Sequence, residues 1–218
     1  MKSVLLIGLG KFGQTLGEDL LEVGADVMIV DKNEAVVNQL APKYTDALIA
    51  NCMNEDNLRS LDIPSFDVCI VAIGDDFQSS LEITSLLKEL GAKHVVSRAT
   101  TNIQRKFLLR NGADEVVYPD KDIAERLAMK LSTKRVVDYI ALSDDYSIFE
   151  ITVPSAWHGK KIVEVNPRKA YGMNILTVKN GDDTLPTPDG EYTFKANDHI
   201  VVFGNTEEIV AFTKGKKK

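Results

Sequence analysis

The stretch VLLIGLGKFGQTLGEDLLEVGADVMIVDK, residues 4–32, decides the fold of this chain. It opens with a short, continuously apolar run bounded by glycine, which is typical of a strand buried on both faces of a parallel sheet. Gly8, Gly10 and Gly13 follow with the spacing GxGxxG. The first glycine permits a tight turn, the second lets the backbone approach a pyrophosphate, and the third lets a helix lie close to the strand.

The residues after the glycines complete a strand, helix and strand unit. Leucines give the helix an apolar face, Gly24 ends it, and residues 26–30 predict a second strand that ends at Asp31. An acid about 20 residues beyond the glycines is placed to accept hydrogen bonds from ribose hydroxyls and to repel a 2′-phosphate. This order predicts a nucleotide site in which phosphates lie at the helix N-terminus. The alternative is that the glycines serve packing alone and Asp31 caps the helix at Glu34.

Composition narrows the class of protein. The chain has 218 residues and a net charge of −6, and its only basic run is the terminal KGKKK, which argues against nucleic acid as a partner. Cys52 and Cys69 lie in or beside apolar runs, as buried thiols in a reducing compartment do. Neither a signal peptide nor an apolar segment of ~18 residues is found, which predicts a soluble, cytoplasmic protein whose membrane role comes through a partner.

Four more predicted strands, at residues 47–50, 66–73, 94–97 and 115–117, alternate with helical patterns. We therefore expect a doubly wound parallel α/β sheet in the order 3-2-1-4-5-6, with a ligand crevice between the first and fourth strands. Asn51 and Cys52 follow the third strand, where the Asn51 amide either reads the adenine or ribose or caps the next helix.

The fourth strand ends at the switch point of this sheet. Ala72, Ile73 and Gly74 flank the predicted crevice. Asp75 and Asp76 follow, and they either cap the next helix or hold a ribose or a cation. The fifth strand ends at Arg98, whose charge is placed to neutralise a phosphate.

The pattern of apolar residues, proline and glycine changes after the sixth strand. A helix at 121–131 with an apolar face and an apolar run at 136–142 predict a crossover or an interface with another copy or domain. From residue 146, short alternating runs punctuated by proline and glycine predict a small sheet-rich domain, closed by a strand and a helix at 202–212. We expect domains at 1–133 and 146–218 joined by a crossover at 134–145. About 70 residues is small for independent stability, which favours dimerisation.

The chain resembles the regulatory proteins of Ktr and Trk potassium uptake systems, built from RCK domains (regulator of conductance of potassium). The resemblance covers nearly the whole chain. It is carried by GLGKFG (8–13), VDKNE (30–34), VAIGDD (71–76), NGADEVVYPDKD (111–122), VDYIALSDDYSIFEITV (137–153) and NPRKAYGMNIL (166–176).

The resemblance implies a Rossmann-like N-terminal domain, a crossover helix pair and a small α+β C-terminal domain. It also implies homodimers assembled into an octameric ring beneath a potassium-translocating membrane subunit, and ATP and ADP as ligands, with NAD(H) in some members. Lys11 stands where relatives often have arginine and would reach a γ-phosphate, either in its own subunit or in the neighbouring one, although lysine lacks the bidentate fork. The implied nucleotide site comprises Gly8, Gly10, Lys11, Phe12, Gly13, Asp31, Lys32, Asn51, Cys52, Ala72, Ile73, Gly74 and Arg98.

The resemblance implies two further sites. Asp120 matches an acid that helps to hold a divalent cation, Mg²⁺ or Ca²⁺, between subunits, which needs a symmetry-related copy close by. Some relatives bind cyclic di-AMP in the C-terminal domain, although Pro167 and the order of Lys169 and Ala170 depart from their usual segment. The residues implied for this site are Ile162, Val163, Arg168, Ala170, Asn174 and Ile175.

The predicted function is a ligand-sensing gating subunit rather than an enzyme. The three histidines have no clustered partner in the sequence, and the cysteines and histidines lack metal-ligand spacing. Two alternatives stay open: a small NAD-dependent oxidoreductase, and a cyclic-dinucleotide receptor whose first nucleotide site is vestigial.

Overall fold

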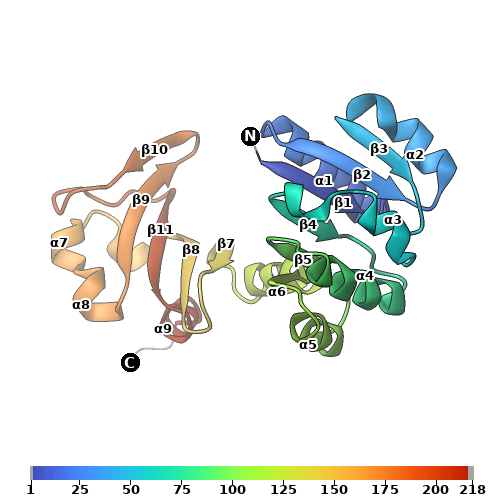
Figure 1. The fold of residues 1–218 in the computed structure, drawn as a ribbon. Helices are drawn as coiled ribbons and strands as arrows, with labels where there is room; N and C mark the ends of the chain where they lie inside the picture. The colour runs from blue at the N-terminus through green and yellow to red at the C-terminus, as the bar shows by residue number, and fades with distance from the viewer. Residues whose placement is uncertain (1, 216–218) are drawn as a thin grey trace. The chain divides into compact units, whose positions relative to one another are not determined.

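The computed structural model describes residues 2–215 and divides the chain into two compact units, residues 1–121 and 122–218 (Figure 1). In the first unit, strands and helices alternate along the chain. Its elements are β1 (Ser3–Ile7), α1 (Lys11–Glu22), β2 (Asp26–Asp31), α2 (Glu34–Leu40), η1 (Ala41–Lys43), β3 (Asp46–Ile49), α3 (Glu55–Arg59), η2 (Ile63–Ser65), β4 (Val68–Val71), α4 (Phe77–Glu89), β5 (Val95–Arg98), α5 (Asn102–Arg110) and β6 (Glu115–Val117).

The six strands of the first unit form one parallel sheet in the order β3-β2-β1-β4-β5-β6, which confirms the predicted fold and strand order. Successive side chains of β1 point to opposite faces of the sheet and pack into two separate hydrophobic cores. Leu5 and Ile7 pack with residues of α3 and α4, whereas Val4 and Leu6 pack with residues of α1 and α2. Because helices cover both faces, the central strands β1 and β4 are buried along almost their whole length and are read in the sequence as apolar runs.

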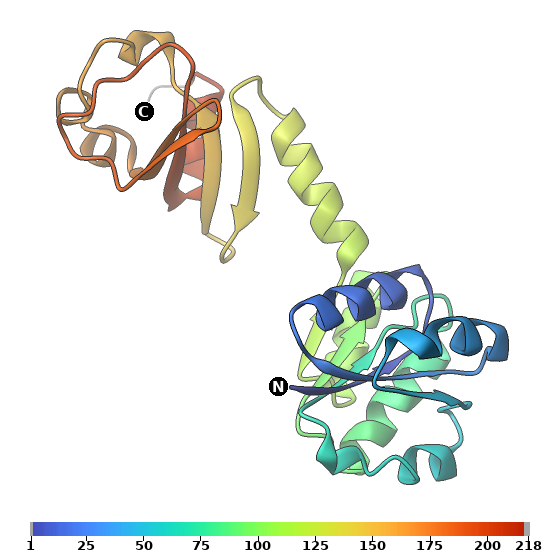
Figure 2. The same cartoon turned by 90° about the horizontal axis from the view of Figure 1, so that it is seen from above.

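The second unit contains an antiparallel sheet in the order β10-β9-β11-β8-β7 (Figure 2). The helix α6 (Pro119–Leu131) spans the division between the units. The remaining elements are β7 (Val136–Ala141), β8 (Tyr146–Thr152), η3 (Ser155–Trp157), α7 (Ile162–Val165), α8 (Pro167–Tyr171), β9 (Asn174–Asn180), β10 (Asp183–Pro186), β11 (Asp198–Asn205) and α9 (Thr206–Thr213).

One face of this second sheet makes the core of the unit. Every second residue of β11 is buried, and Ile200 and Val202 pack with Phe149 of β8. The aromatic ring of Trp157 lies 5.4 Å from the rings of both Phe194 and Phe212. This alternation is the pattern of a sheet covered on one side.

The structure differs from the sequence prediction around the crossover. Helix α6 begins at Pro119, so Asp120 lies in its first turn instead of ending the sixth strand. The apolar run after it, predicted as a crossover or an interface, is β7, an edge strand paired antiparallel with β8. Its pairing depends on contacts with residues later in the chain, such as Tyr139 opposite Phe149, which local periodicity does not reveal.

The apolar face predicted for α6 is exposed in the chain. Ile123, Leu127 and Leu131 are 68%, 52% and 74% exposed, and α6 contains no buried residue. Among the described residues, the helices lack the combination of length and hydrophobicity that crossing a bilayer requires.

Candidate functional site

The glycine turn between β1 and α1 has the geometry that its spacing predicts. Gly8 has φ +96°, a left-handed conformation that L side chains rarely adopt. A Cβ on Gly13 would lie 2.0 Å from the carbonyl oxygen of Gly8, so this glycine is needed for the close approach of helix and turn. A Cβ on Gly10 would have no neighbour within 4 Å, so the space in front of this residue is open.

The N-terminus of α1 is free to bind an anion. Gly10 is its N-cap residue, no side chain caps the helix, and its first turn carries no acidic side chain. The first amides of an α-helix have no intrahelical partner, and the helix dipole favours negative charge beside them. Open space and unpaired donors therefore coincide at Gly10.

Asp31 connects this turn to the end of β2. Its carboxylate accepts a hydrogen bond from the backbone N–H of Leu9 at 2.6 Å and another from that of Asn33 at 2.8 Å. Asn33, and not Asp31, is the N-cap of α2, because its side chain accepts from the amides of Ala35 and Val36. Asp31 thus fixes the glycine turn, and its remaining lone pairs are available to ribose hydroxyls.

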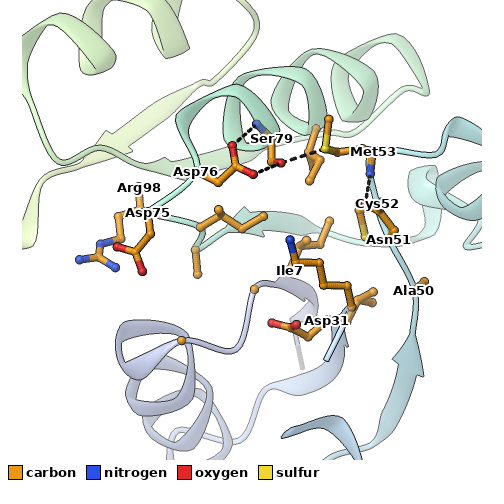
Figure 3. Close-up of a pocket in the computed structure, with 18 of the residues that line it drawn as sticks. Ile7, Asp31, Ala50, Asn51, Cys52, Met53, Asp75, Asp76, Ser79 and Arg98 are labelled. Carbon is orange, nitrogen blue, oxygen red and sulfur yellow. Dashed lines mark hydrogen bonds between the residues drawn. The ribbon is translucent and has the colours of Figure 1, made fainter. Parts of the chain in front are cut away.

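A cavity of about 520 Å³ opens at the carboxyl ends of the strands (Figure 3). This volume lies within the range of ordinary small-molecule sites. The cavity is lined by Ile7, Gly8, Gly10, Lys11, Val30, Asp31, Lys32, Ala50, Asn51, Cys52, Met53, Ala72, Ile73, Gly74, Asp75, Asp76, Ser79, Ile83 and Arg98.

One end of the cavity is formed by the segment after β3. The side-chain oxygen of Asn51 accepts a hydrogen bond from the amide of Met53 at 3.1 Å, and Asn54 is the N-cap of α3. Asn51 therefore stabilises its own turn rather than capping the helix. Burial, together with the charge of Asp31, raises the pKa of the Cys52 thiol to about 12. The thiol is therefore neutral at physiological pH and forms an apolar part of the cavity wall.

The opposite wall of this end is the N-terminus of α4. The Asp76 carboxylate accepts from the amide of Ser79 at 3.1 Å and from its hydroxyl at 2.6 Å, so Asp76 is the predicted helix cap. These hydrogen bonds lower the pKa of Asp76. The positive charge of Lys32 also lowers this pKa. The Ser79 hydroxyl lies 2.8 Å from the Met53 sulfur, so the two walls meet (Figure 3). Asp75 lines the cavity without capping the helix.

Arg98 closes the other end of the cavity. Its guanidinium lies 5.3 Å from the ring centroid of Phe12, and one of its nitrogens lies 3.6 Å from the Asp120 carboxylate. A Cβ on Gly74 would lie 2.8 Å from the Arg98 Nη1, so the absence of a side chain at Gly74 makes room for the guanidinium. The Nε of Arg98 is buried and has no hydrogen-bond partner within the described chain.

Most of the predicted nucleotide site comes together in this cavity. Eleven of the thirteen predicted residues line it, and the exceptions are Phe12 and Gly13. Phe12 contacts Arg98, and Gly13 packs against the turn. Sequence reasoning missed the apolar lining of Ile7, Val30, Ala50 and Ile83, as well as Met53 and Ser79. Ser79 follows Asp76 by three residues, which is the spacing of an N-cap contact and is the one signal that could have found it.

The predicted cation residue has a different neighbour. Asp120 pairs with Arg98, and its side chain is 73% exposed. Within residues 2–215 of one chain, no group of three or more histidine, cysteine or acidic side chains is arranged to hold a metal ion.

The residues predicted for cyclic di-AMP lie in the second unit, outside the cavity. Ile162 and Val163 are in α7, Arg168 and Ala170 are in α8, and Asn174 and Ile175 begin β9. Arg168 and Ala170 are exposed, and Val163 is 58% exposed. Helices α7 and α8 lie together at one side of the unit, and β9 follows them into the sheet between β10 and β11 (Figure 1).

Two histidines have partners that the sequence did not indicate. His199 Nδ1 lies 3.2 Å from Glu150, which also pairs with Lys179 at 2.6 Å. His94 lies 3.9 Å from Asp114 and 3.8 Å from Glu115. The first cluster joins three neighbouring strands, and the second joins the start of β5 to the start of β6. None of these residues lines the cavity.

Comparisons with known proteins agree with this architecture. Residues 4–119 match the TrkA-N domain family and residues 146–214 match the TrkA-C domain family. The chain is 38% identical to Ktr system potassium uptake protein A of Bacillus subtilis, over 97% of this chain and 95% of the relative. It is 34% identical to Ktr system potassium uptake protein C of the same organism, over 98% and 96%.

Solved structures show the same fold. The RCK domain of GsuK superposes with a TM-score of 0.69 at 18% identity, covering 98% of this chain and 47% of the other. The GsuK channel bound to NAD has a TM-score of 0.69 at 17% identity, covering 100% and 40%. GsuK bound to ADP has a TM-score of 0.53 at 14% identity, covering 62% and 35%.

Proposed function

The chain belongs to the family of Ktr-type RCK regulatory subunits of potassium uptake, and we propose that it senses adenine nucleotides and gates a potassium-translocating membrane partner. The family supports a role in potassium uptake with a membrane partner. Nucleotide sensing, gating, a position at the inner face of the membrane and the absence of an enzymatic activity are our proposals. The relatives are named as potassium uptake proteins, which supports a regulatory rather than a catalytic role.

One observation carries the proposal: the groups that recognise a nucleotide converge on one cavity. The open backbone at Gly10 and the free N-terminus of α1 suit a phosphate, and Asp31 suits a ribose. Lys11 and Arg98 add positive charge at the phosphate end, whereas Cys52 and Met53 form an apolar end suited to a base. GsuK, which has this fold, has been solved with NAD and with ADP.

ATP and ADP differ by a γ-phosphate, so gating requires a contact that only ATP makes. Lys11 lines the cavity at the first position of α1 and has no ion-pair partner among residues 2–215. We assign it to the γ-phosphate. A ligand shifts a two-state protein only by its differential affinity for the two states, and roughly 1–3 kcal/mol of coupling is typical.

Calorimetric titration of the nucleotide-stripped chain with ATP, ADP and NADH tests the assignment. Lys11→Ala should weaken ATP binding by about tenfold, close to one charge-assisted contact, and change ADP binding much less. Lys106→Ala, an exposed lysine of α5 outside the cavity, is the matched control. Equal losses for ATP and ADP would remove Lys11 from the mechanism. Tight binding of NADH alone would favour the oxidoreductase alternative.

We further propose cyclic di-AMP as a second ligand, with Arg168 contacting a phosphate and Asn174 a base edge. The exposure of Arg168 and Val163 on adjoining short helices supports an accessible surface. Arg168→Ala should abolish cyclic di-AMP binding and leave ADP binding unchanged, and loss of both would contradict two separate sites.

The predicted assembly also stays a proposal. The exposed apolar face of α6 and the exposed carboxylate of Asp120 both suit homodimers, which the family resemblance arranges as an octameric ring with a divalent cation between subunits. Light scattering of the chain with and without Mg²⁺ or Ca²⁺ measures both the stoichiometry and any dependence on the cation. A monomer under all conditions would contradict this proposal.

A further inference from the structure

In the second unit, the loop 187–197 joins β10 to β11 and is anchored by one buried carboxylate. Asp198, the first residue of β11, is 1% exposed. Its Oδ2 accepts hydrogen bonds from the Tyr192 hydroxyl at 2.8 Å and from the backbone N–H of Lys195 at 2.7 Å. Its Oδ1 accepts a third from the side-chain amide of Asn180, at the end of β9, at 2.7 Å. A buried carboxylate is stable only where such donors replace water, so these bonds fix the loop to the sheet.

Tyr192 is suited to hold this contact. Burial, followed by the hydrogen bond to Asp198, raises the pKa of its phenol to about 12, so the hydroxyl is a protonated donor at physiological pH. Its ring lies 6.1 Å from the ring of Phe194, which is 1% exposed. The loop is therefore held both by polar contacts to Asp198 and by apolar packing against the core of the unit.

The anchored loop pairs with the segment that leads into α7. Four backbone hydrogen bonds, 2.9–3.0 Å long, join residues 190–194 of the loop to residues 159–163. Lys161 and Thr193 form an antiparallel bridge between these segments. The amides of Ile162 and Val163, the first two residues of α7, are among the donors. The position of α7 therefore follows that of the loop.

Helix α7 carries part of the surface proposed above for cyclic di-AMP. Ile162 packs against the core of the unit, and Val163 is 58% exposed. A helix of four residues is not stable by itself, because so few hydrogen bonds do not repay the cost of nucleation. Its place on the unit depends on contacts with other segments, and those of its first two amides come from the loop that Asp198 holds.

We propose that Asp198 is a positioning residue for cyclic di-AMP: from beneath the surface its carboxylate fixes the loop 187–197, and the loop sets the place of Ile162 and Val163. The inference rests on the proposed second ligand and names a residue outside the predicted surface on which binding depends. Where the loop is released, only a fraction of the molecules is competent to bind, and the apparent affinity falls by that fraction.

Calorimetric titration of the full chain with cyclic di-AMP tests this inference. Asp198→Ala leaves all three donors without an acceptor and should weaken binding by at least about tenfold. Tyr192→Phe removes one donor and keeps the ring, so it should weaken binding roughly threefold. Asp198→Asn should restore nearly the wild-type affinity, because its amide oxygen can still accept from Tyr192 and Lys195.

Ser147→Ala is the matched control, because it also removes a hydrogen bond of a buried hydroxyl in the second unit. The Ser147 hydroxyl oxygen lies 2.7 Å from that of Thr206, and Ser147 pairs with Gly204, near the end of β11 that is remote from Asp198. This variant should keep the wild-type affinity for cyclic di-AMP. ADP binding should be unchanged in every variant, because none of the substituted residues lines the cavity of the first unit.

Hydrogen exchange of the same variants separates release of the loop from a general loss of stability. In Asp198→Ala and Tyr192→Phe, amide exchange should become faster at residues 159–163, and in Ser147→Ala it should stay as in the wild type there. If Asp198→Ala does not fold, Tyr192→Phe carries both measurements.

Unchanged affinity for cyclic di-AMP in the folded Asp198 and Tyr192 variants, or an equal loss in Ser147→Ala, would overturn the inference and leave cyclic di-AMP binding itself intact. A wild-type chain that does not bind cyclic di-AMP would instead overturn the proposed second ligand, and the positioning role with it.

Discussion

The two units of this chain place their candidate sites on different kinds of structure. In the first unit the cavity lies at the carboxyl edge of a buried parallel sheet, and much of it is backbone, from Gly8 to Gly10 and at Gly74. In the second unit the candidate residues lie on α7 and α8, helices of four and five residues, and at the start of strand β9 of the antiparallel sheet. A backbone site depends on the exact shape of its turns, whereas a side-chain surface depends on the core beneath it.

The largest expected effect is on the core of the second unit. Phe194 is 1% exposed, and its ring contacts Trp157 and Tyr192. Phe194→Ala should lower the free energy of unfolding of this unit by about 3–5 kcal/mol, because a large buried ring is replaced by a cavity. Urea denaturation followed by fluorescence measures this directly, since Trp157 is the single tryptophan of the chain.

The same variant sharpens the comparison between the units. ADP binding by Phe194→Ala should match that of the wild type in low urea, because none of the second unit's residues lines the described cavity. A parallel loss of ADP affinity would mean that the two units do not function separately.

The second-largest expected effect distinguishes the roles of two glycines in the turn between β1 and α1. Gly13→Ala should destabilise the first unit by roughly 3 kcal/mol, since its Cβ would meet the Gly8 carbonyl oxygen at 2.0 Å and overpacking is costly. Gly10→Ala, whose Cβ meets nothing, should keep the stability and weaken nucleotide binding instead. Thermal unfolding followed by circular dichroism, together with ADP titration, distinguishes the two, and equal stability losses would contradict the description of the turn.

The smallest effect is electrostatic and belongs to the second unit. Hydrogen bonds from the Arg126 guanidinium, 2.6–2.9 Å long, lower the pKa of Asp138 to about 2. A carboxyl whose pKa is lowered on folding stabilises the folded state above its unfolded pKa, near 4, and loses this contribution as the pH falls towards 2. Asp138→Asn should therefore cost less than about 1 kcal/mol at neutral pH, because the pair is largely exposed.

Urea midpoints of the wild type and Asp138→Asn should differ at neutral pH and converge between about pH 4 and about pH 2. A difference that does not depend on pH would assign the effect to packing rather than to charge.

The first unit could be predicted from sequence because its signals are local. The apolar runs, the glycine spacing and Asp31 follow from backbone rules, and the structure places each strand within a few residues of its predicted position. The partners of the charged groups could not be predicted. Arg98 meets Phe12 and Asp120 only after folding, and Asp31 holds the amide of Leu9, 22 residues away.

The second unit could be predicted less well because its elements are short and depend on distant partners. The apolar run at 136–142 predicts only a crossover or an interface, and it forms the edge strand β7 because β8 pairs with it. Helices α7 and α8 are too short to show a periodicity, and their boundary is marked only by Asn166, in a left-handed conformation before Pro167. The functional prediction for this surface therefore rests on family resemblance, whereas that for the cavity also rests on geometry.

Hydrogen exchange of the full chain with and without ADP tests the central claim most directly. If the cavity of the first unit is the nucleotide site, ADP should slow amide exchange at residues 8–13 and 51–53 and leave residues 162–175 unchanged. Protection confined to residues 162–175, or none in either unit at saturating ADP, would contradict the assignment of the nucleotide site.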